Sequence, residues 1–262
     1  MTEWDADGYS RVAALQAAMA GEALALIKFK GNERVLDLGC GSGKITAQLA
    51  SRLQNGSIVG IDSSAEMTAF AEKAFPSSTW PNLRFQQADI RKLDFHEEFD
   101  LVVSFNALHW IPDQEYALGR VRAAMRQHAT AQLRLVPKGK RKSLEDVIEE
   151  TRQSPRWARY FGGFHDPYLH LTPEEYAALA ERNGLRVFRL HTEDKAWDFE
   201  SRAEFLAFAK VTFIAWTQFL PENERPDFCA DVLDRYMAVA REGLGEENFF
   251  RFYQMDITLA RK

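Results

Sequence analysis

The feature that most constrains the fold is residues 33–44, where an apolar run ends in three alternating glycines and a helical pattern follows. Val35–Leu38 is nearly continuous in apolar residues, which is typical of a strand buried on both faces of a parallel sheet. Aliphatic residues then recur every four positions from Ile45 to Leu53, as on one face of a helix. The stretch predicts a strand, a tight turn and a helix, which is the opening unit of an open α/β sheet.

The glycine loop predicts a ligand at the start of that helix. Glycine lacks a Cβ, so the backbone can adopt positive φ and a ligand can approach it, while the free N–H groups of the helix start point toward the ligand. Gly39, Gly41 and Gly43 are spaced G-x-G-x-G, whereas the last position of a dinucleotide fingerprint falls here on Lys44. Asp37, at the strand end, would repel a pyrophosphate and attract an ammonium or sulfonium. These residues favour S-adenosylmethionine over NAD.

The run Val35–Gly43 resembles the first motif of the class I S-adenosylmethionine-dependent methyltransferases, a hydrophobic-Asp-hydrophobic-Gly-x-Gly-x-Gly pattern. The resemblance implies an α/β fold with a Rossmann-like, doubly wound, seven-stranded and mostly parallel sheet, an antiparallel edge hairpin and a helical lid or cap. It implies S-adenosyl-L-methionine as the cofactor, with the backbone of residues 39–43 beside it. Cys40 is interpreted as a small loop residue at this cofactor site and not as a nucleophile.

Later apolar runs predict six further strands and divide the chain into three regions. We expect residues 1–30 to form an N-terminal helical lid, residues 31–142 the cofactor-binding core, and residues 143–262 a helical insert on the acceptor side with the strands that complete the sheet. Residues 126–130 are expected to form the turn into the fifth strand. The six predicted strands are residues 58–61, 83–88, 99–106, 131–136, 185–190 and 249–259, the last two pairing as the edge hairpin.

Polar residues at the ends of these strands predict the rest of the cofactor site. Asp62 follows the glycine loop by about twenty residues, where nucleotide-binding folds place an acid that accepts hydrogen bonds from ribose hydroxyls. Ser63, with Glu66 three residues later, offers a capping box, which leaves Asp62 for the ribose. The pair Asp89-Ile90 resembles the adenine site of the family, with a carboxylate for the exocyclic amine and an aliphatic side chain against the ring. Ser63 and Asn106, which ends the fourth strand, are also assigned to the cofactor.

The residues after the fourth strand are expected to meet the methyl acceptor, because open α/β sheets bind ligands at the carboxyl ends of their strands. His109 and Trp110 lie there, and His109 is the candidate general base if the acceptor needs one. A histidine in this position is as often a polar group bonded to the backbone. Tyr9 in the leading helix could lie over cofactor or substrate. Arg156 and Tyr160 could clamp a carboxylate, although surface charges are an equally good interpretation.

The chemistry favours a small-molecule acceptor. Methyl transfer from a sulfonium is an in-line displacement, so the enzyme mainly positions two reactants, and an ionised carboxylate needs no base. Residues 60–64, 108–113 and 171–176 resemble the trans-aconitate and juvenile-hormone-acid methyltransferase group, which implies O-methylation of an organic acid, with a hydroxyl acceptor remaining open. Two alternatives are an NAD-dependent oxidoreductase, disfavoured by Asp37 and the glycine spacing, and a non-catalytic nucleotide-binding regulator.

The composition of the chain indicates which classes of binding partner to expect. The net charge is −5 and no long basic block is present, so nucleic acid is an unexpected partner. The two cysteines, the lack of a signal pattern and the lack of a long apolar run predict a soluble cytoplasmic protein that does not enter a membrane. No metal site is predicted, and the oligomeric state is left open.

Overall fold

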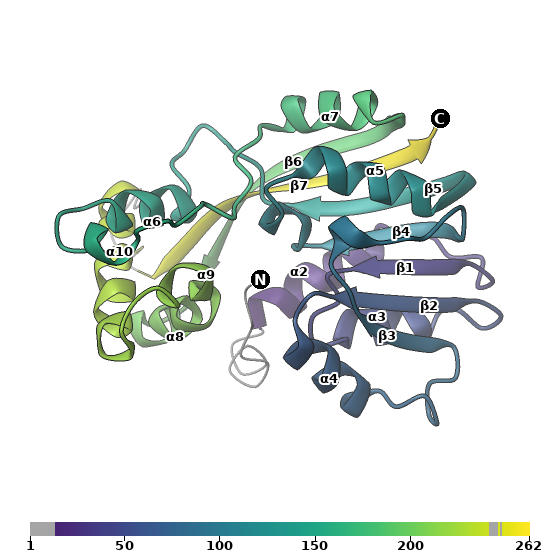
Figure 1. Ribbon diagram of the computed structural model, residues 1–262, viewed down its shortest axis with the longest axis horizontal. Coiled ribbons are helices and arrows are strands. Elements are labelled where there is room, and N and C mark those ends of the chain that lie inside the picture. The colour runs from purple at the N-terminus through teal and green to yellow at the C-terminus, as the bar shows by residue number, and fades with distance from the viewer. Residues whose placement is uncertain (1–13, 241–245, 247) are drawn as a thin grey trace.

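The computed structural model describes residues 14–240, 246 and 248–262, and its centre is a seven-stranded sheet of order β3-β2-β1-β4-β5-β7-β6 (Figure 1). Strands β1 to β5 are parallel, and β7 is antiparallel to both β5 and β6. The predicted mostly parallel sheet with an antiparallel edge hairpin is therefore confirmed. The strands are β1 Arg34–Leu38, β2 Ser57–Asp62, β3 Leu83–Gln87, β4 Phe99–Phe105, β5 Met125–Leu135, β6 Leu185–Asp198 and β7 Phe249–Arg261.

Helices cover both faces of the sheet, because its central strands are apolar on both sides. On one face, Leu36 and Val102 pack with α5 (Gln114–Ala124) and α7 (Pro173–Arg182). On the other, Val35 and Val103 pack with α2 (Ala14–Ala25) and α3 (Lys44–Ala50), and α4 (Ala65–Ala74) lies against β2 and β3. Chain order reverses between β1 and β4, which makes the carboxyl ends of these two strands the switch point of the sheet.

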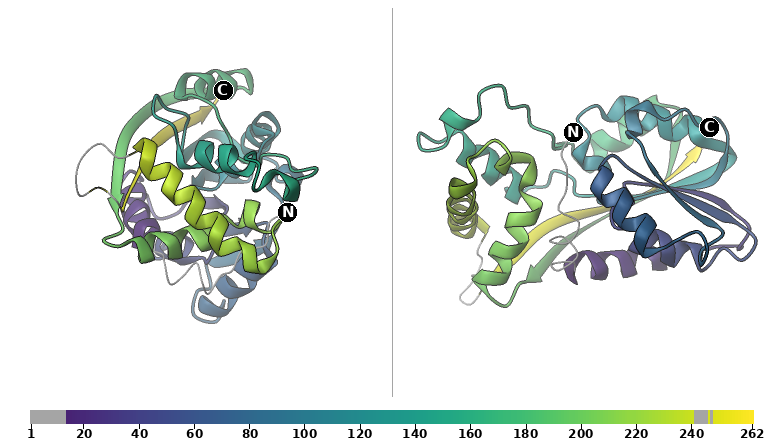
Figure 2. Two further views of the ribbon diagram at one scale, coloured as in Figure 1. Left: turned by 90° about the vertical axis from the view of Figure 1, so that its left-hand side faces the viewer. Right: turned by 60° about the horizontal axis from the view of Figure 1, so that its bottom comes forward.

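A second group of helices forms a cap beyond the carboxyl ends of the parallel strands (Figure 1). The sheet reaches this cap through β6 and β7, whose pairing continues to Asp198 and Phe249, past the last residue pair of β5 with β7 (Figure 2). Trp157, Trp216 and Phe228 are buried in the aromatic core of the cap together with Phe250 of β7. The cap helices are α6 Leu144–Arg152, α8 Arg202–Thr212, α9 Ile214–Thr217 and α10 Arg225–Ala240.

The predicted turn at residues 126–130 is wrong, because β5 already begins at Met125. Met125 pairs with Phe99, and pairing resumes at Thr130 opposite Leu101. The residues between them form a bulge inside the strand, with His128 at a φ of 69°. The polar residues 126–130, whose composition is typical of a turn, therefore belong to the irregular first part of β5.

No helix among the described residues is both long enough and apolar enough to cross a bilayer.

Candidate functional site: a cofactor cavity at the switch point

A cavity of about 640 Å³ opens where β1, β2 and β4 end, at the switch point of the sheet. Its volume lies within the range of about 300–1,000 Å³ that small-molecule and cofactor sites occupy. Segments from five parts of the chain meet there. The lining residues are Gly39, Gly41, Asp62, Ser63, Met67, Asp89, Ile90, Arg91, Phe105, Asn106, Ala107, Trp110, Ile111, Pro112, His165, Asp166 and Pro167.

The three predicted loop glycines have different roles in the structure. All three have positive φ, but only Gly39 and Gly41 line the cavity. A Cβ built on Gly41 would meet nothing within 4 Å, whereas a Cβ on Gly43 would lie 2.6 Å from Cζ of Phe85 and 2.9 Å from Cβ of Ala71. Gly41 thus keeps the cavity open, and Gly43 lets β3 and α4 pack against the loop.

Two alanine substitutions separate these roles. Gly41→Ala is expected to cost about 1 kcal/mol of unfolding free energy, from the left-handed backbone alone, and to weaken S-adenosylhomocysteine binding about tenfold or more because the methyl group enters the cavity. Gly43→Ala adds overpacking and is expected to cost about 3 kcal/mol. Chemical denaturation and calorimetric titration measure both quantities. Equal stability loss in the two variants would contradict the assignment.

Asp37, which precedes the loop, and Cys40, within it, are buried and are not among the residues that line the cavity. Burial and the nearby carboxylates raise the pKa of the Cys40 thiol well above its usual range, so the side chain is a packed thiol. Asp37 accepts a hydrogen bond from Oγ1 of Thr46 at 2.7 Å. Burial raises the pKa of Asp37 to about 7, with a smaller contribution from Asp62. The Asp37 side chain is therefore not part of the described cavity lining.

Asp62 links the glycine loop to the next helix. Its Oδ2 accepts a hydrogen bond from the backbone N–H of Gly41, and its Oδ1 accepts one from the N–H of Ser64, both at 2.9 Å. The predicted cap at Ser63 is wrong, because Ser64 precedes α4 and its hydroxyl accepts from the N–H of Met67. Ser63 instead lines the cavity beside Asp62. The carboxylate thus lies at the cavity and is fixed in place by two backbone donors.

Asp89 and Ile90 line the cavity at the end of β3, next to Arg91, which the sequence did not single out. The guanidinium of Arg91 donates from Nε to Oδ1 of Asp89 at 3.0 Å and from Nη2 to Oδ2 at 2.7 Å. These bonds hold the pKa of Asp89 below its usual range. The Asp89 carboxylate is therefore ionised and fixed in orientation.

Asn106 lies at the cavity with a φ of 57°, a left-handed conformation that asparagine tolerates better than most residues. Its backbone N–H donates to the carbonyl of Arg134, and its side-chain nitrogen is 3.7 Å from the sulfur of Met19 in α2. Its buried Oδ1 has no hydrogen-bond partner among the described residues. An acceptor in that state fits the ammonium of a bound S-adenosylmethionine.

α2 is docked beside Asn106 by the buried Arg134. The guanidinium donates to both carboxylate oxygens of Asp256, each at 2.8 Å, and to the carbonyl of Met19. It also lies 3.2 Å from a carboxylate oxygen of Glu22 on α2. A charge network centred on the buried Arg134 thus connects the sheet, the leading helix and the cavity wall.

Trp110 and His109 are adjacent in the chain but point in different directions. Trp110 lines the cavity and packs edge-on against Tyr168 and against Trp216 of the cap, at centroid distances of 5.2 and 5.7 Å. His109 is buried and does not line the cavity, and its Nδ1 accepts from the N–H of Val136 at 3.3 Å. Burial lowers the pKa of His109 to about 3. The bond from Val136 occupies Nδ1, and the ring is not part of the described cavity lining.

The structure does not bring Arg156 or Tyr160 to the cavity. Arg156 donates to Asp227 of α10 at 2.8 Å and stacks on Trp157, while the Tyr160 hydroxyl lies 3.4 Å from Glu224. Both pairs lie within the cap, so a carboxylate clamp at these residues is not supported by their positions. Tyr9 lies outside the described residues.

The cavity wall also contains His165, Asp166 and Pro167, which the sequence interpretation missed. They follow the Gly162-Gly163 pair in the segment between α6 and α7. The run of histidine, aspartate and proline after two glycines is the signal that could have pointed to a functional loop.

Comparisons with known proteins agree with this geometry. Residues 35–128 match the family model described as a methyltransferase domain. The chain is 34% identical to trans-aconitate 2-methyltransferase of Deinococcus radiodurans over 184 residues, which cover 69% of each protein. It is 38% identical to the enzyme of the same name from Escherichia coli O1:K1 over 113 residues, 43% of each.

A solved structure supports the fold. Phosphoethanolamine N-methyltransferase 2 of Haemonchus contortus, in complex with S-adenosyl-L-methionine, superposes with a TM-score of 0.64 at 15% identity. The match covers 98% of this chain and 56% of that one. Together with the family match and the glycine loop, these findings show that the protein belongs to the class I S-adenosylmethionine-dependent methyltransferases and uses S-adenosyl-L-methionine as its methyl donor.

Proposed function

We propose that the enzyme methylates a carboxylate oxygen of a small organic acid, forming a methyl ester. The observation that carries the proposal is the position of His109, whose buried imidazole accepts from the backbone N–H of Val136 and is not part of the described cavity lining. A carboxylate with an ordinary pKa near 4 is ionised at neutral pH and is a nucleophile without a base. The similarity to trans-aconitate 2-methyltransferases points to the same acceptor class.

Residues at the strand ends would bind the methyl donor at one end of the cavity. Asp62 would accept hydrogen bonds from the ribose hydroxyls, Asp89 would accept from the adenine amine, and Ile90 would pack against the ring. The backbone at Gly39 and Gly41, with the Asn106 amide oxygen, would hold the methionine part. S-adenosylmethionine supplies a methyl group already activated by the sulfonium charge, so these residues mainly orient it.

The acceptor end would be formed by Trp110 and the loop 165–167. Apolar side chains, among them Phe105 and Ile111, exclude water around the reacting carboxylate. The basic residues of the described cavity lining are Arg91, which Asp89 holds, and His165. His165 would therefore be the basic side chain of the described lining that is placed to bind an acceptor carboxylate. We propose that α2 and the cap helices close over this end as a lid.

The identity of the product tests the proposal. The enzyme is incubated with S-adenosylmethionine carrying a labelled methyl group and a metabolite extract, and the labelled product is treated with mild alkali. A methyl ester releases labelled methanol under these conditions, whereas a methyl ether or methylamine keeps the label. Labelled product that survives the treatment contradicts ester formation.

His165 favours a second candidate, O-methylation of a hydroxyl with His165 as the base, because its side chain lies at the cavity where His109 does not. The variant His165→Gln separates the two. For a carboxylate acceptor, kcat is expected to stay within about threefold while KM rises about tenfold through the lost hydrogen bond. For a hydroxyl acceptor, kcat is expected to fall about 100-fold or more. Steady-state kinetics on the product-yielding acceptor measure both constants, and His96→Asn, on the exposed surface, is the control.

A further inference from the structure

His170 lies between a cavity-lining loop and the first helix of the cap. Its Nε2 lies 2.8 Å from Oδ2 of Asp166, which lines the cavity, and its Nδ1 lies 3.5 Å from Oδ1 of Asp146 on α6. Residues 165–167 are called the rim below. The one imidazole thus lies within ion-pair distance of two carboxylates from different parts of the chain.

Both carboxylates have fixed positions of their own. The other oxygen of Asp166 accepts from the N–H of Tyr168 at 2.9 Å. Asp146 belongs to the capping box of α6, where its Oδ2 accepts from the N–H of Ser143 at 2.9 Å. Each carboxylate can therefore act as an anchor, and His170 is the element that connects them.

The segment around His170 also supports the acceptor side of the cavity. The N–H of Leu169 donates to the carbonyl of His109 at 2.8 Å, and the N–H of Lys138 donates to the carbonyl of Leu171 at 2.9 Å. Tyr168 packs against Trp110, with ring centroids 5.2 Å apart. A change at His170 would therefore reach the rim and the tryptophan at the cavity.

We propose that His170 is a positioning residue that ties the rim to α6 when its imidazole carries both protons, and that the rim loosens when one proton is lost. The inference rests on the proposed assignment of the rim to the acceptor end. The chemical reason is that an imidazolium has an N–H for each carboxylate, whereas the neutral ring donates through one nitrogen only. A neutral His170 must release either the rim or the helix.

The surrounding charges support the protonated form. The hydrogen bond and charge of Asp166 raise the pKa of His170 above its ordinary value, with further contributions from Asp146 and Glu145 of α6, while burial opposes them. The ring of Tyr168 also packs against it, and burial raises the pKa of Glu145 to about 7, so Glu145 gains its charge over the same pH range. Because a raised histidine pKa stabilises the folded arrangement at low pH, the link is present in acid and is lost as pH rises through that pKa.

Hydrogen–deuterium exchange tests the proposal without an acceptor. Exchange is measured in peptides covering the rim and the start of α6 at about pH 6 and about pH 8.5, on either side of the histidine range, and corrected for intrinsic rates. In the natural protein, we expect exchange in the rim to be about three to ten times faster at the higher pH. His170→Asn is expected to exchange fast at both pH values, and His170→Arg, which keeps a charge with several donors, to stay protected at both.

The control variant is His96→Asn, which removes an exposed histidine paired with Asp94 and should keep the natural pattern in the rim. Affinity for S-adenosylhomocysteine should change by less than about threefold in all variants. Three results would each overturn the proposal. In the first, the rim of His170→Asn exchanges as slowly as in the natural protein at about pH 6, at both pH values. In the second, exchange in His170→Arg depends on pH as in the natural protein, and in the third, a variant that exchanges faster also loses affinity for S-adenosylhomocysteine. If His170→Asn does not fold, the proposal is tested by comparing the pH dependence of exchange in the natural protein with that in His170→Arg. Failure of ester formation would leave the exchange result intact, so the two proposals are tested separately.

Discussion

Replacing Asp62 with alanine is expected to weaken S-adenosylhomocysteine binding by about 100-fold or more. The carboxylate lies at the cavity and is aimed by the N–H groups of Gly41 and Ser64. Each hydrogen bond from a ribose hydroxyl to an ionised acceptor contributes about 1.5–3 kcal/mol, and the carboxylate can accept two. The substitution also releases the loop at Gly41. Isothermal titration calorimetry measures the loss directly.

A matched control is Asp198→Ala. Asp198 lies at the end of β6 and accepts from the N–H two residues later, at Glu200, as Asp62 accepts from Ser64. Both substitutions remove the same type of local backbone bond, but Asp198 is not among the residues that line the cavity. Asp198→Ala should therefore bind S-adenosylhomocysteine within about twofold of the natural protein. An Asp62→Ala variant that binds as well as this control would refute the ribose assignment.

The sheet and the meeting of its strand-end residues at one cavity were predictable from the sequence, because both depend on local patterns. Apolar runs separated by helical spacing define a parallel sheet, and parallel strands bring their carboxyl ends to one edge. Asp62 ends its strand, Asp89 and Asn106 come just after theirs, and the three residues meet at one cavity. The family assignment then replaces the two alternatives, an NAD-dependent oxidoreductase and a non-catalytic regulator, with a methyltransferase.

The acceptor side was not predictable in the same way, because it depends on how distant segments pack. The sequence placed His109 and Trp110 together, but they lie in a three-residue 3-10 turn, Leu108–Trp110, that buries one side chain and turns the other to the cavity. Too few residues are involved for periodicity to decide which side chain is buried. The charge of Arg156 suggests a carboxylate site, but its partner Asp227 comes from a helix far along the chain.

The rim was missed for the same reason. Residues 165–167 have no regular periodicity, and their position at the cavity is fixed by contacts such as the one between Leu169 and His109. Long-range tethers of this kind leave no local pattern. A glycine pair followed by histidine and aspartate indicates a loop, but the sequence does not say which cavity that loop reaches.

The Asp37→Asn variant is expected to be more stable than the natural protein above neutral pH, by about 4 kcal/mol. Asp37 is buried, and its pKa is raised from 3.8 to about 7, mainly by burial. Between these values the folded protein binds more protons than the unfolded chain, so its stability falls as pH rises from about 4 to about 7. Asparagine carries no charge at any of these pH values and can still accept the hydrogen bond from Thr46. The stability difference should therefore grow from about pH 4 and level off above about pH 7.

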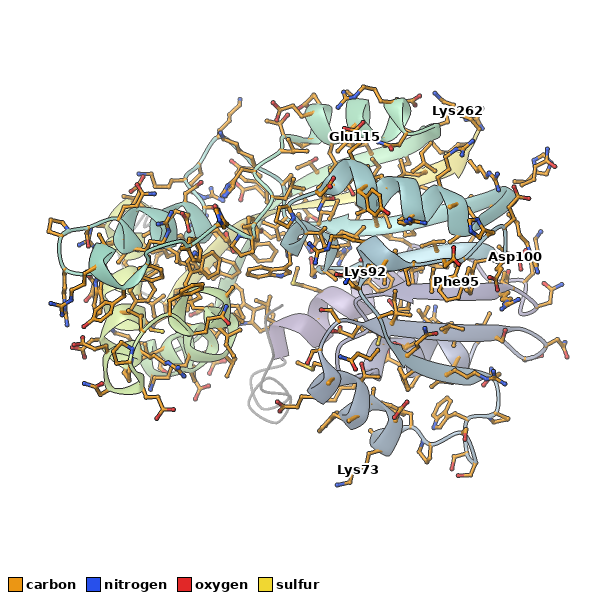
Figure 3. All side chains as sticks on the ribbon, in the orientation of Figure 1. Lys73, Lys92, Phe95, Asp100, Glu115 and Lys262 are labelled. Carbon is orange, nitrogen blue, oxygen red and sulfur yellow. The ribbon has the colours of Figure 1, made fainter. Side chains whose placement is uncertain are left out.

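Asp100→Asn provides a control of opposite sign. Asp100 lies at the end of the sheet remote from the cap (Figure 3). It accepts from the backbone N–H of Arg34 at 2.8 Å and from the Arg126 guanidinium at 2.9 Å. Although burial opposes them, these partners lower the pKa of Asp100, so it stabilises the fold above its unfolded pKa and loses that effect as pH falls. Asp100→Asn should thus be less stable than the natural protein at neutral pH, with the difference shrinking in acid.

Urea unfolding of the three proteins from about pH 2 to about pH 8 gives both curves, because the Asp100 difference changes below the ordinary carboxyl pKa and the Asp37 difference changes above it. If the Asp37→Asn difference is flat with pH, Asp37 is not a carboxyl group held against ionisation. A bound cation near the loop should favour the ionised form of Asp37, so saturating S-adenosylmethionine is expected to reduce the stability gap between the natural protein and Asp37→Asn at high pH. An unchanged gap in the presence of the donor would show that the charge of Asp37 does not act on the cofactor.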